Sequence, residues 1–539
     1  MVIRGRRAPS VDDDLGHGAC GRRPGGGTRV QVLWPECPGV WSIQQMGDEI
    51  SASSYSREER QRYREKVQLC LDVFERMLST STFESDGANP MTGLEVELNL
   101  VDAERQPYLG NAAVLEEIAD PAYQTELGAY NIELNVPPRP LRGDAALGLE
   151  DDLRASLNHA EEMAGRRGAD IVMVGILPTL MTEHLSRPDW MSPSPRYSAL
   201  NDMVFAARGE DVHLDIHGVE RLSLYASTLA PESACTSVQL HLQVDPSDFA
   251  KHWNAAQVLT GPQVALGANS PFFFGRELWH ETRIELFAQS TDTRPQELKN
   301  QGVRPRVWFG ERWITSIFDL FEENVRYFPA LLPEVSDEDP VAEFEAGRPP
   351  RLQELRLHNG TIYRWNRPVY DVVDGTPHVR VENRVLPAGP TVVDILANAA
   401  FYYGALRVLA DDERPVWSKM TFPTADENFR EGARLGLDAA LYWPGIGEVT
   451  VEELVLRRLL PMAHEGLERW GVGAAVRDRY LGVIEQRVKT GRNGASWQVA
   501  CVHALEERGL SRREALTRML DLYLDGMHSN EPVHTWPVP

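Results

Sequence analysis

The sequence predicts an α+β protein built on a mostly antiparallel sheet, and two observations carry that prediction. Short segments alternate apolar and polar residues at positions 94–100, 131–136, 238–244 and 379–385. This period of two is typical of strands with one face on a core and the other face open. Long helical patterns lie between and after these segments. We therefore expect helices to cover the apolar face of the sheet and to leave its polar face accessible.

The elements of the amino-terminal half follow in order. An amphipathic helix begins at Ser56, and its apolar residues recur up to Leu78. The continuous apolar run at 171–177 predicts a buried strand, and the Pro and Ser residues over 184–228 predict loops with short helices. The remaining elements expected in this half are strands at 94–101 and 131–136 and a helix at 147–166.

The carboxyl-terminal half is expected to complete the sheet and then to turn helical. The acidic, Pro-rich segment 336–350 predicts an exposed connection. The elements expected there are a strand at 238–244, a helix near 248–267 after Pro246, strands at 361–366 and 378–386, and predominantly helical sequence from Val392 to about Met527.

We divide the chain into one domain and two terminal segments. Residues 1–45 include Gly25-Gly26-Gly27 and show no periodicity, which predicts a disordered or non-native extension. They contain no continuous apolar stretch followed by a cleavage signal, so we expect no secretory peptide. The protein proper then begins near Met46, with a single domain over 46–527 and a tail over 528–539.

Charge and cysteine usage restrict the partners and the compartment. The formal net charge of -24 argues against a nucleic-acid or anionic-membrane partner, so small molecules are the expected partners. We find no apolar stretch of about 18 residues and expect no membrane helix. The five cysteines form no CxxC pair, which is typical of a reducing compartment, and we expect a cytoplasmic protein.

The polar faces of the predicted strands carry groups suited to metal and phosphate. A merely solvated face would carry Thr, Lys and Ser without pattern. The four alternating segments instead present Glu95, Glu97 and Asn99; Asn131, Glu133 and Asn135; Gln239, His241 and Gln243; and Arg380, Glu382 and Arg384. This pattern therefore predicts that the polar face of the sheet forms the floor of an active site.

Glu95 and Glu97 stand two residues apart on one strand, so their carboxylates point the same way with Cα atoms about 6.6–7 Å apart. Oxygen ligands of this kind suit Mg²⁺ or Mn²⁺ in sites that also bind phosphates. The expected ligands, enough for two or three divalent ions, are Glu95, Glu97, Glu133, His241 and Glu382.

Arginines on the same face are expected to neutralise phosphate, because no GxxxxGK[ST] loop is present. Arg384 lies two residues from Glu382 and would face a transferring phosphoryl group, with Arg380 beside it. Arg364 is a further candidate for nucleotide contact, facing the cleft with Trp365 packed behind it. The alternative for this segment is an edge strand with cation–π packing.

Seven motifs resemble, in order, the bacterial carboxylate–amine ligase branch of the glutamate–cysteine ligase superfamily, its second family. The matching segments span roughly residues 91–500 and are Gly93–Glu97, Ile132–Pro138, Ser237–Leu242, Asn269–Arg276 with Arg283, Val381–Arg384, Thr391–Asp394 and Gly494–Gln498. The block around Asn269-Ser270-Pro271-Phe272 and the ordered series are more specific than the glutamate motifs. Two departures are Gln239, which stands where the family has His, and extra length within 184–235 and 300–360.

The resemblance implies a glutamine-synthetase-like catalytic domain, a funnel of mostly antiparallel strands that binds ATP and Mg²⁺ or Mn²⁺. The implied reaction activates the γ-carboxylate of glutamate as an acyl phosphate and couples it to an amine, with cysteine as the default acceptor. It implies Glu382 and Arg384 as catalytic groups and Arg276, Arg283 and Gln239 as candidates for substrate contact.

Other functions remain open at this point. A different amine or acid substrate, a non-catalytic nucleotide- or metal-binding homologue, and a phosphotransferase on the same sheet are the alternatives. A homo-oligomer is also possible.

Overall fold

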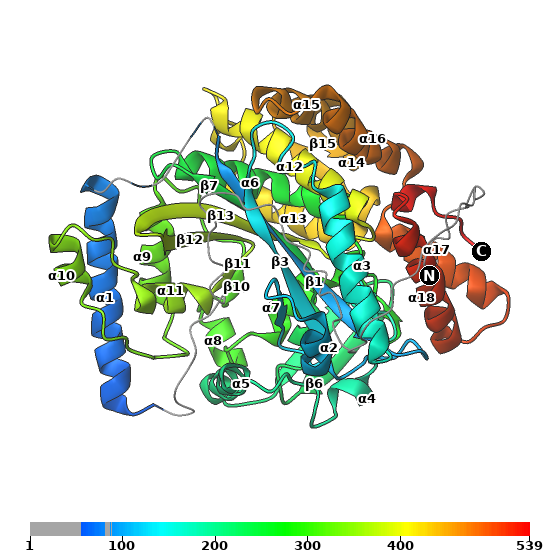
Figure 1. Cartoon of the computed structure of the whole chain (residues 1–539), viewed down its shortest axis with the longest axis horizontal. Coiled ribbons are helices and arrows are strands. Elements are labelled where there is room, and N and C mark those ends of the chain that lie inside the picture. Colours follow the sequence, from blue (N-terminus) through cyan, green and yellow to red (C-terminus); the bar gives the residue numbers. More distant parts are fainter. Residues whose placement is uncertain (1–54, 81–82, 84–86, 88) are drawn as a thin grey trace, which may run out of the picture. The chain divides into compact units, whose positions relative to one another are not determined.

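The computed structural model describes residues 55–80, 83, 87 and 89–539. The extension expected at residues 1–45 and the start expected near Met46 lie outside the described residues. A curled antiparallel sheet of seven strands forms the centre of the fold, in the order β12–β13–β7–β1–β3–β2, with β4 beside β1 (Figure 1). The strands are β1 (Met91–Val101), β2 (Tyr123–Thr125), β3 (Asn131–Pro140), β4 (Asp170–Val172), β7 (Ser237–Val244), β12 (Asn366–Val373) and β13 (Thr376–Pro387).

Four small two-stranded ladders lie outside this sheet. They pair β5 (Val212–His217) with β6 (Arg221–Ala226), β8 (Phe272–Phe273) with β9 (Arg276–Glu277), β10 (Val307–Trp308) with β11 (Tyr363–Arg364), and β14 (Ala440–Trp443) with β15 (Gly447–Thr450). Of these, only the β10–β11 ladder is parallel.

Helices account for most of the remaining chain. Up to residue 360 they are α1 (Arg57–Thr80), α2 (Asn111–Ile118), α3 (Glu150–Arg166), α4 (Thr182–Leu185), α5 (Pro195–Arg208), α6 (Phe249–Gly267), α7 (Thr282–Ser290), α8 (Gln296–Asn300), α9 (Ile317–Tyr327), α10 (Pro340–Glu345) and α11 (Gln353–Gly360). The later ones are α12 (Val392–Asp411), α13 (Phe422–Leu435), α14 (Val451–Leu454), α15 (Leu460–Arg469), α16 (Ala474–Thr490), α17 (Gly494–Glu507) and α18 (Arg512–Ser529).

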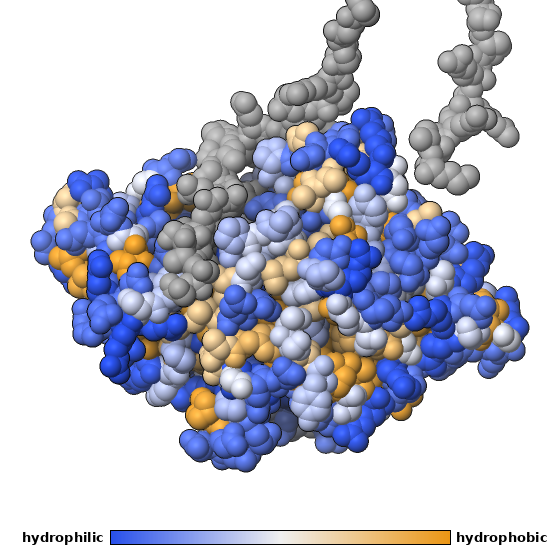
Figure 2. Space-filling view, turned by 90° about the horizontal axis from the view of Figure 1, so that it is seen from below, coloured by the Kyte–Doolittle hydropathy of each residue, from blue (hydrophilic) through white to orange (hydrophobic). Residues whose placement is uncertain are grey.

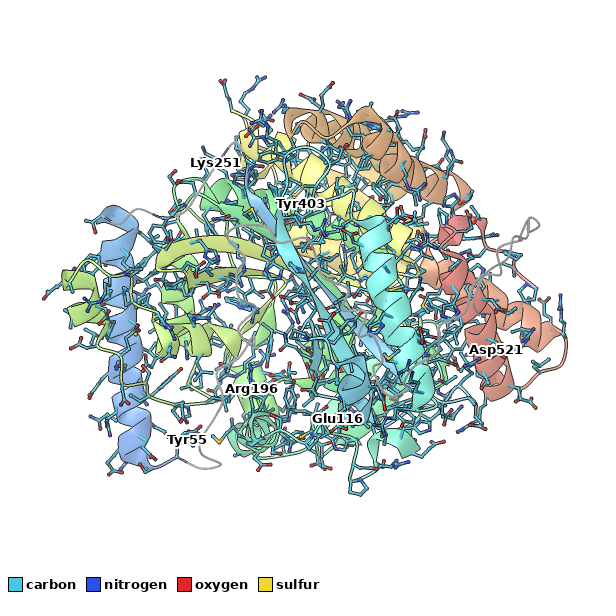
Figure 3. The ribbon with its side chains drawn as sticks, viewed as in Figure 1. Tyr55, Glu116, Arg196, Lys251, Tyr403 and Asp521 are labelled. Atoms are coloured by element: carbon cyan, nitrogen blue, oxygen red, sulfur yellow. The ribbon has the colours of Figure 1, made fainter. Side chains whose placement is uncertain are left out.

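Helices α6 and α12 cover the apolar face of the sheet. Both are buried nearly all round, which explains why neither sequence shows an amphipathic stripe. Of the described helices, α12 alone is long and apolar enough to span a membrane, but 89% of its most apolar window is buried inside the protein, as expected of a core helix. Tyr403 on α12, labelled in Figure 3, donates a hydrogen bond to the carbonyl oxygen of His241 at 3.0 Å and so ties the helix to β7.

Buried amides fasten α6 to the two outer strands. Asn383 of β13 exchanges hydrogen bonds with Gln263 of α6, at 2.8 and 3.1 Å, and donates to Asn366 of β12 at 2.8 Å. Asn366 in turn donates to Gln257 of α6 at 2.6 Å. Because buried polar groups are costly unless paired, this network fixes the position of β13 along the helix.

The fold class expected from the sequence is confirmed, and the differences are local. Of the apolar run 171–177, only 171–172 belongs to a strand, β4, and the rest continues as buried loop. The segment 184–228 contains the β5–β6 hairpin, 336–350 contains α10, and the helical region after Val392 is interrupted by the β14–β15 hairpin. The two hairpins form by short-range strand pairing, which a weak local sequence pattern does not reveal.

The residues expected to form a tail pack against the domain. Trp536 is 3% exposed and contacts the rings of Trp497 and Tyr523 edge-on, with centroids 5.1 and 5.3 Å away. Arg492 donates to the Trp536 carbonyl oxygen at 2.9 Å. The face seen in Figure 2 is mostly hydrophilic, with hydrophobic areas scattered among charged ones, in keeping with the high net charge.

Candidate active site

A pocket of about 430 Å³ opens on the polar face of the sheet. Strands β1, β3, β7 and β13 supply its floor, and the segments around α5, α7 and β11 supply its walls. Arg196, in the first turn of α5, is the wall residue labelled in Figure 3. The charged residues that line the pocket are Glu97, Glu126, Glu133, Glu232, Arg196, Arg283, Arg367 and Arg384.

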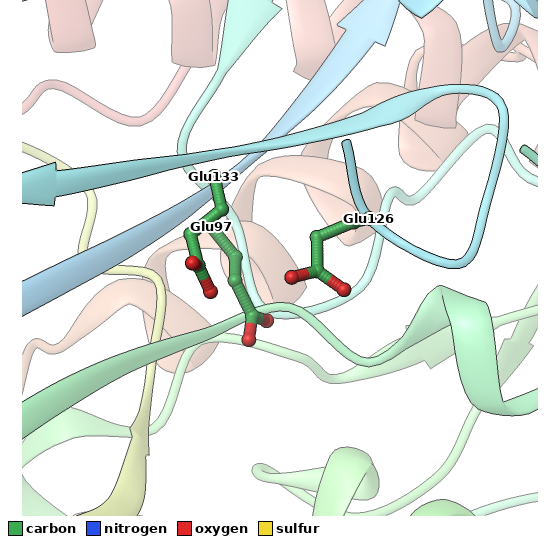
Figure 4. Close-up of side chains that lie close together, drawn as sticks. All are labelled: Glu97, Glu126 and Glu133. Carbon is green, nitrogen blue, oxygen red and sulfur yellow. The ribbon is translucent and has the colours of Figure 1, made fainter. Parts of the chain in front are cut away.

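Three carboxylates converge on the pocket floor. Glu97 on β1 stands directly opposite Glu133 on β3, and Glu126 follows β2 on the same side (Figure 4). One ligand oxygen from each lies within 4.8 Å of the others. Three acidic groups at this spacing repel one another unless protons or a cation intervene.

Burial and mutual repulsion hold protons on this group. Burial and then Glu126 raise the pKa of Glu97 to about 7. Burial, followed by Glu95, Glu126 and Glu97, raises the pKa of Glu133 well above its usual range, and burial raises that of Glu126. A hard divalent cation would replace these protons, since its preferred ligands are carboxylate oxygens. The donor set therefore fits Mg²⁺ or Mn²⁺.

Hydrogen bonds from β7 orient Glu97. Its carboxylate accepts from the Ser237 backbone N–H at 2.6 Å, from the Ser237 hydroxyl at 3.1 Å and from Gln239 Nε2 at 3.0 Å. The other end of the Gln239 amide accepts from Arg384. Gln239 thus links Glu97 to Arg384 through the two ends of its amide. A neutral histidine at this position could also donate to one group and accept from the other, but with a different geometry.

Two pocket arginines are held by one buried carboxylate. Glu382 is 0% exposed, and Arg367 donates to its Oε2 through Nε at 3.0 Å and Nη2 at 2.8 Å, while Arg384 donates to Oε1. Burial alone would raise the pKa of Glu382, but Arg367 and Arg384 hold it well below its usual range. A register shift between Asn383 and Leu386 aims Arg384 into the pocket, as bulges beside active sites commonly do.

The sequence predicts Glu382 as a metal ligand, but in the structure both of its oxygens face arginines and it does not line this pocket. His241 and Glu95 lie further along the same face. His241 Nε2 is 2.9 Å from Glu95 Oε1, and Arg380 Nε donates to His241 Nδ1 at 3.2 Å. Because Nδ1 accepts this bond, Nε2 is the ring nitrogen left for a metal. It is buried and has no hydrogen-bond partner among the described residues, so His241 stays a predicted ligand.

Three further predicted arginines occupy three different environments. Arg283 is buried in the pocket wall, where Nε donates to Glu281 at 3.0 Å. Arg380 contacts His241 and His378 rather than the pocket. Arg276 is exposed and bonds Glu220 at 3.1 Å, outside the pocket lining.

The expected orientation of Arg364 and Trp365 is reversed. Arg364 is buried against Glu323 at 3.1 Å and Asn324 at 2.9 Å, with its guanidinium 4.8 Å from the Trp308 ring centroid. Trp365 lines the pocket instead. Successive residues of a strand face opposite ways. An error of one position in the predicted register therefore moves every side chain of the segment to the other face.

Sequence reasoning missed Glu126, Glu232, Arg196 and Arg367 as pocket residues. Glu126 could have been found, because Gln124 pairs with Glu133 across β2–β3. Glu126 stands two residues after Gln124 and therefore faces the same side as Glu133. Arg367 has the same parity as Tyr363 and Trp365, which also line the pocket. Glu232 lies in η1 (Glu232–Ala234), a 3-10 helix of one turn that is too short to show a periodic sequence pattern.

The curled antiparallel sheet, covered by helices on one face and charged on the other, has the glutamine-synthetase-like fold. The model of the glutamate-cysteine ligase family 2 (GCS2) matches residues 91–519. The chain belongs to that family, and thereby to the carboxylate–amine ligases. No curated protein sequence matches this chain.

One of the solved structures similar to this chain shares its fold at low sequence identity. The glutamate–cysteine ligase of Francisella tularensis in complex with AMP is 11% identical, with a TM-score of 0.50 over 84% of this chain and 90% of that chain. The bifunctional glutathione synthetase of Pasteurella multocida is 12% identical, with a TM-score of 0.47 over 87% of this chain and 54% of that one. A complex of the prokaryotic ubiquitin-like protein Pup with its ligase PafA gives a TM-score of 0.33 at 11% identity, over 81% of this chain and 74% of that one.

Proposed function

We propose that this protein is an ATP-dependent ligase that joins the γ-carboxylate of glutamate to an amine, with cysteine as the expected acceptor. The observation that carries the proposal is one pocket with three converging carboxylates on its floor, Glu97, Glu126 and Glu133, beside Arg367 and Arg384. An acidic cation site next to guanidinium groups is the pairing that phosphoryl transfer from a nucleotide requires. Family membership adds the carboxylate–amine ligase class.

The reaction divides into two displacements. In the first, an oxygen of the glutamate γ-carboxylate forms a bond to the γ-phosphorus of ATP, the bond to the β-phosphate oxygen breaks, and ADP leaves. In the second, the amine nitrogen bonds to the carbonyl carbon, the carbon–oxygen bond to phosphate breaks, and inorganic phosphate leaves. Each step needs alignment of the attacking atom more than covalent help from the protein.

The residues of the pocket meet these needs in distinct ways. Arg384 and Arg367 supply positive charge for the phosphate groups, and Glu382 holds both guanidinium groups in place. Glu97, Glu126 and Glu133 would hold Mg²⁺ or Mn²⁺, and the buried Glu95 Oε2, without a hydrogen-bond partner among the described residues, is a further candidate ligand. A divalent ion bound there would neutralise negative charge on the nucleotide phosphates.

Cysteine as the acceptor follows from the family, whose description names it. A ligase with another amine or another acid is the second candidate. The observation that favours it is the set of residues that α5 contributes to the pocket wall. The wall carries Arg196, Tyr197 and Leu200 of α5, within the region of extra length between 184 and 235. We also propose a cytoplasmic location, because Cys70, Cys235 and Cys501 are all free thiols.

The test is an incubation of the purified protein with ATP, Mg²⁺ and L-glutamate, with and without L-cysteine, followed by phosphate release and product mass. Cysteine-dependent phosphate together with the mass of γ-glutamylcysteine is the expected result. Glutamate-dependent turnover without that mass would call for a screen of ammonium, L-alanine and ethylamine as acceptors. A folded protein that binds ATP but releases no phosphate in any mixture would support the non-catalytic alternative.

A further inference from the structure

We infer that Glu232 binds the acceptor as an ammonium cation and takes the proton that the nitrogen must lose before it attacks. This inference rests on the proposed ligase function and adds to it the residue that selects the second substrate. It also defines that substrate's class, which is a primary amine that arrives protonated.

The placement of Glu232 separates it from the other acidic groups of the pocket. It lines the pocket wall from η1, whereas the convergent group consists of Glu97, Glu126 and Glu133. Among the described residues, none donates a hydrogen bond to its carboxylate or forms an ion pair with it. The pocket arginines with carboxylate partners are already engaged, Arg367 and Arg384 by Glu382 and Arg283 by Glu281. Glu232 therefore keeps its lone pairs for a ligand.

The turn that carries Glu232 is rigid. The Glu232 N–H donates to the Leu229 carbonyl oxygen at 2.9 Å, and the Cys235 N–H donates to the Glu232 carbonyl oxygen at 2.9 Å. Ser233 Oγ donates to the Ala230 carbonyl oxygen at 2.8 Å and lies 3.2 Å from the Tyr130 hydroxyl. A carboxylate aimed into a pocket from a fixed backbone is the arrangement expected of a binding group rather than of a mobile surface side chain.

Aromatic rings line the pocket on the side where α7 packs against η1. Phe287 of α7 contacts the rings of Tyr363 and Trp365, with centroids 5.2 and 5.9 Å away, and all three line the pocket. Ring faces attract ammonium groups, and a carboxylate adds hydrogen-bond acceptors. The Trp365 ring already carries the Arg283 guanidinium, 5.7 Å from its centroid, so Glu232 and the rings of Phe287 and Tyr363 are the groups left for an ammonium cation.

Proton transfer follows from the same position. The ammonium nitrogen has no lone pair, so R–NH₃⁺ gives one proton to the Glu232 carboxylate and becomes R–NH₂. The amine then attacks the acyl carbon, and its second proton leaves with the departing phosphate as HPO₄²⁻. Burial, followed by repulsion from Glu126 and Glu97, raises the pKa of Glu232 in the protein without metal or acceptor. An ammonium cation beside the carboxylate lowers that pKa again, so the bound acceptor meets an ionised carboxylate that can take its proton.

The charged and titratable groups that face Glu232 come from several elements. They are Glu97 on β1, Glu126 after β2, Tyr130 before β3, Arg384 on β13, Tyr363 on β11 and Cys235 after η1.

The experiment compares two nucleophiles on the full-length Glu232→Gln variant. Hydroxylamine is uncharged at neutral pH and needs no base, so it reports acyl phosphate formation alone. L-Cysteine arrives as an ammonium cation and needs both binding and deprotonation. If wild type makes no product from L-cysteine, the acceptor is whichever of ammonium, L-alanine or ethylamine gives product. Glu232→Asp is the conservative variant, and Glu183→Gln, at an exposed pair with Arg513, is the matched control.

We expect Glu232→Gln to make glutamyl hydroxamate within about threefold of wild type and to lose amide formation with the cationic acceptor by about 10²–10⁴-fold. Glu232→Asp should recover part of that loss, and Glu183→Gln should match wild type on both. Equal rates on both nucleophiles, or an equal loss on both, would overturn the inference. It would also be overturned if wild type used hydroxylamine but none of the four cationic amines. A wild type that makes no hydroxamate would instead refute the proposed ligase function, whatever the variant does.

Discussion

Glu97 and Glu133 occupy directly opposite positions on neighbouring antiparallel strands, so two buried carboxylates face each other across the pocket floor. A like-charged cross-strand pair is destabilising by itself. Its retention at the centre of a well-packed sheet means that the cost is offset by function, and the third carboxylate, Glu126, concentrates the charge further.

Glu133→Gln is expected to raise stability and remove activity together. At pH 8 the unfolded Glu133 is ionised, and folding forces it either to take up a proton or to repel Glu97, whereas a glutamine does neither. The free energy of unfolding in EDTA should therefore rise by about 1–3 kcal/mol. Turnover should fall by at least about 100-fold, because a metal ligand is lost. Urea unfolding and phosphate release measure the two effects. Glu220→Gln, which disturbs a pair with Arg276 outside the pocket, should change neither by much. A variant that is less stable and fully active would refute the metal-site assignment.

Stability without metal is expected to fall as pH rises. Burial and neighbouring carboxylates raise the pKa of Glu97 to about 7 and that of Glu232 to about 8, against the ordinary value of 4.5. The folded state therefore holds protons that the unfolded state has released, so this contribution is full below about pH 4.5 and is lost as pH climbs to about 8. For Glu97 alone the change is on the order of 3 kcal/mol.

Thermal unfolding in EDTA between pH 5 and pH 8 measures this loss, and added Mg²⁺ should restore more stability at pH 8 than at pH 5. Glu382 acts in the opposite sense. Arg367 and Arg384 lower its pKa, so its contribution is present above about pH 4.5 and disappears only on further acidification. A melting temperature in EDTA that rises steadily from pH 5 to pH 8 would contradict the raised pKa values of the pocket carboxylates.

Arg384→Lys is expected to lower kcat by about 100-fold or more. Arg384 donates to both Gln239 and Glu382 while lining the pocket, and a lysine ammonium lacks the planar fork that serves these groups and a phosphate together. Steady-state kinetics with ATP as the varied substrate measure the effect. Arg276→Lys is the matched control, since Arg276 is exposed and lies outside the pocket lining. A larger effect at Arg276 than at Arg384 would restore the interpretation of Arg276 as a substrate ligand.

A chain that begins at Met46 is expected to keep full activity and stability. The family match begins at residue 91, and all of the described residues that line the pocket lie at or after Glu97. Phosphate release and thermal unfolding of the shortened and full-length proteins make the comparison. Loss of activity in the shortened protein would show that residues 1–45 take part in the enzyme.

Much of this site is predictable from alternation within long strands, and the remainder is not, for identifiable reasons. Glu97, Glu133, Gln239 and Arg384 lie on strands of eight or more residues, where parity determines which face a side chain occupies. Glu126 follows a strand of only three residues, and Glu232 lies in one 3-10 turn. The sequence around each is too short to show a pattern that predicts where the side chain points.

The roles of the predicted residues depend on tertiary contacts that no sequence pattern contains. Glu382 alternates correctly onto the polar face, yet Arg367 from the neighbouring strand occupies its Oε2. His241 also lies on that face, but Arg380 engages its Nδ1 and leaves Nε2 beside Glu95. In both cases the contact depends on which strands are neighbours and on the rotamers of the side chains. Both are determined only in the folded chain.

The reversed orientation of Arg364 and Trp365 leads to a paired substitution experiment. Arg367→Met should lower kcat by about 100-fold, because Arg367 lines the pocket and shares Glu382 with Arg384. Arg364→Met should leave the kcat of folded protein and the KM for ATP within about threefold of wild type. It should cost about 3 kcal/mol of stability, since it removes the buried one of the two guanidinium partners of Glu323 and leaves only the half-exposed Arg312. Urea unfolding and kinetics corrected for the folded fraction separate the two effects. A raised KM for ATP in Arg364→Met, without loss of stability, would return Arg364 to the nucleotide site and contradict the register of β11.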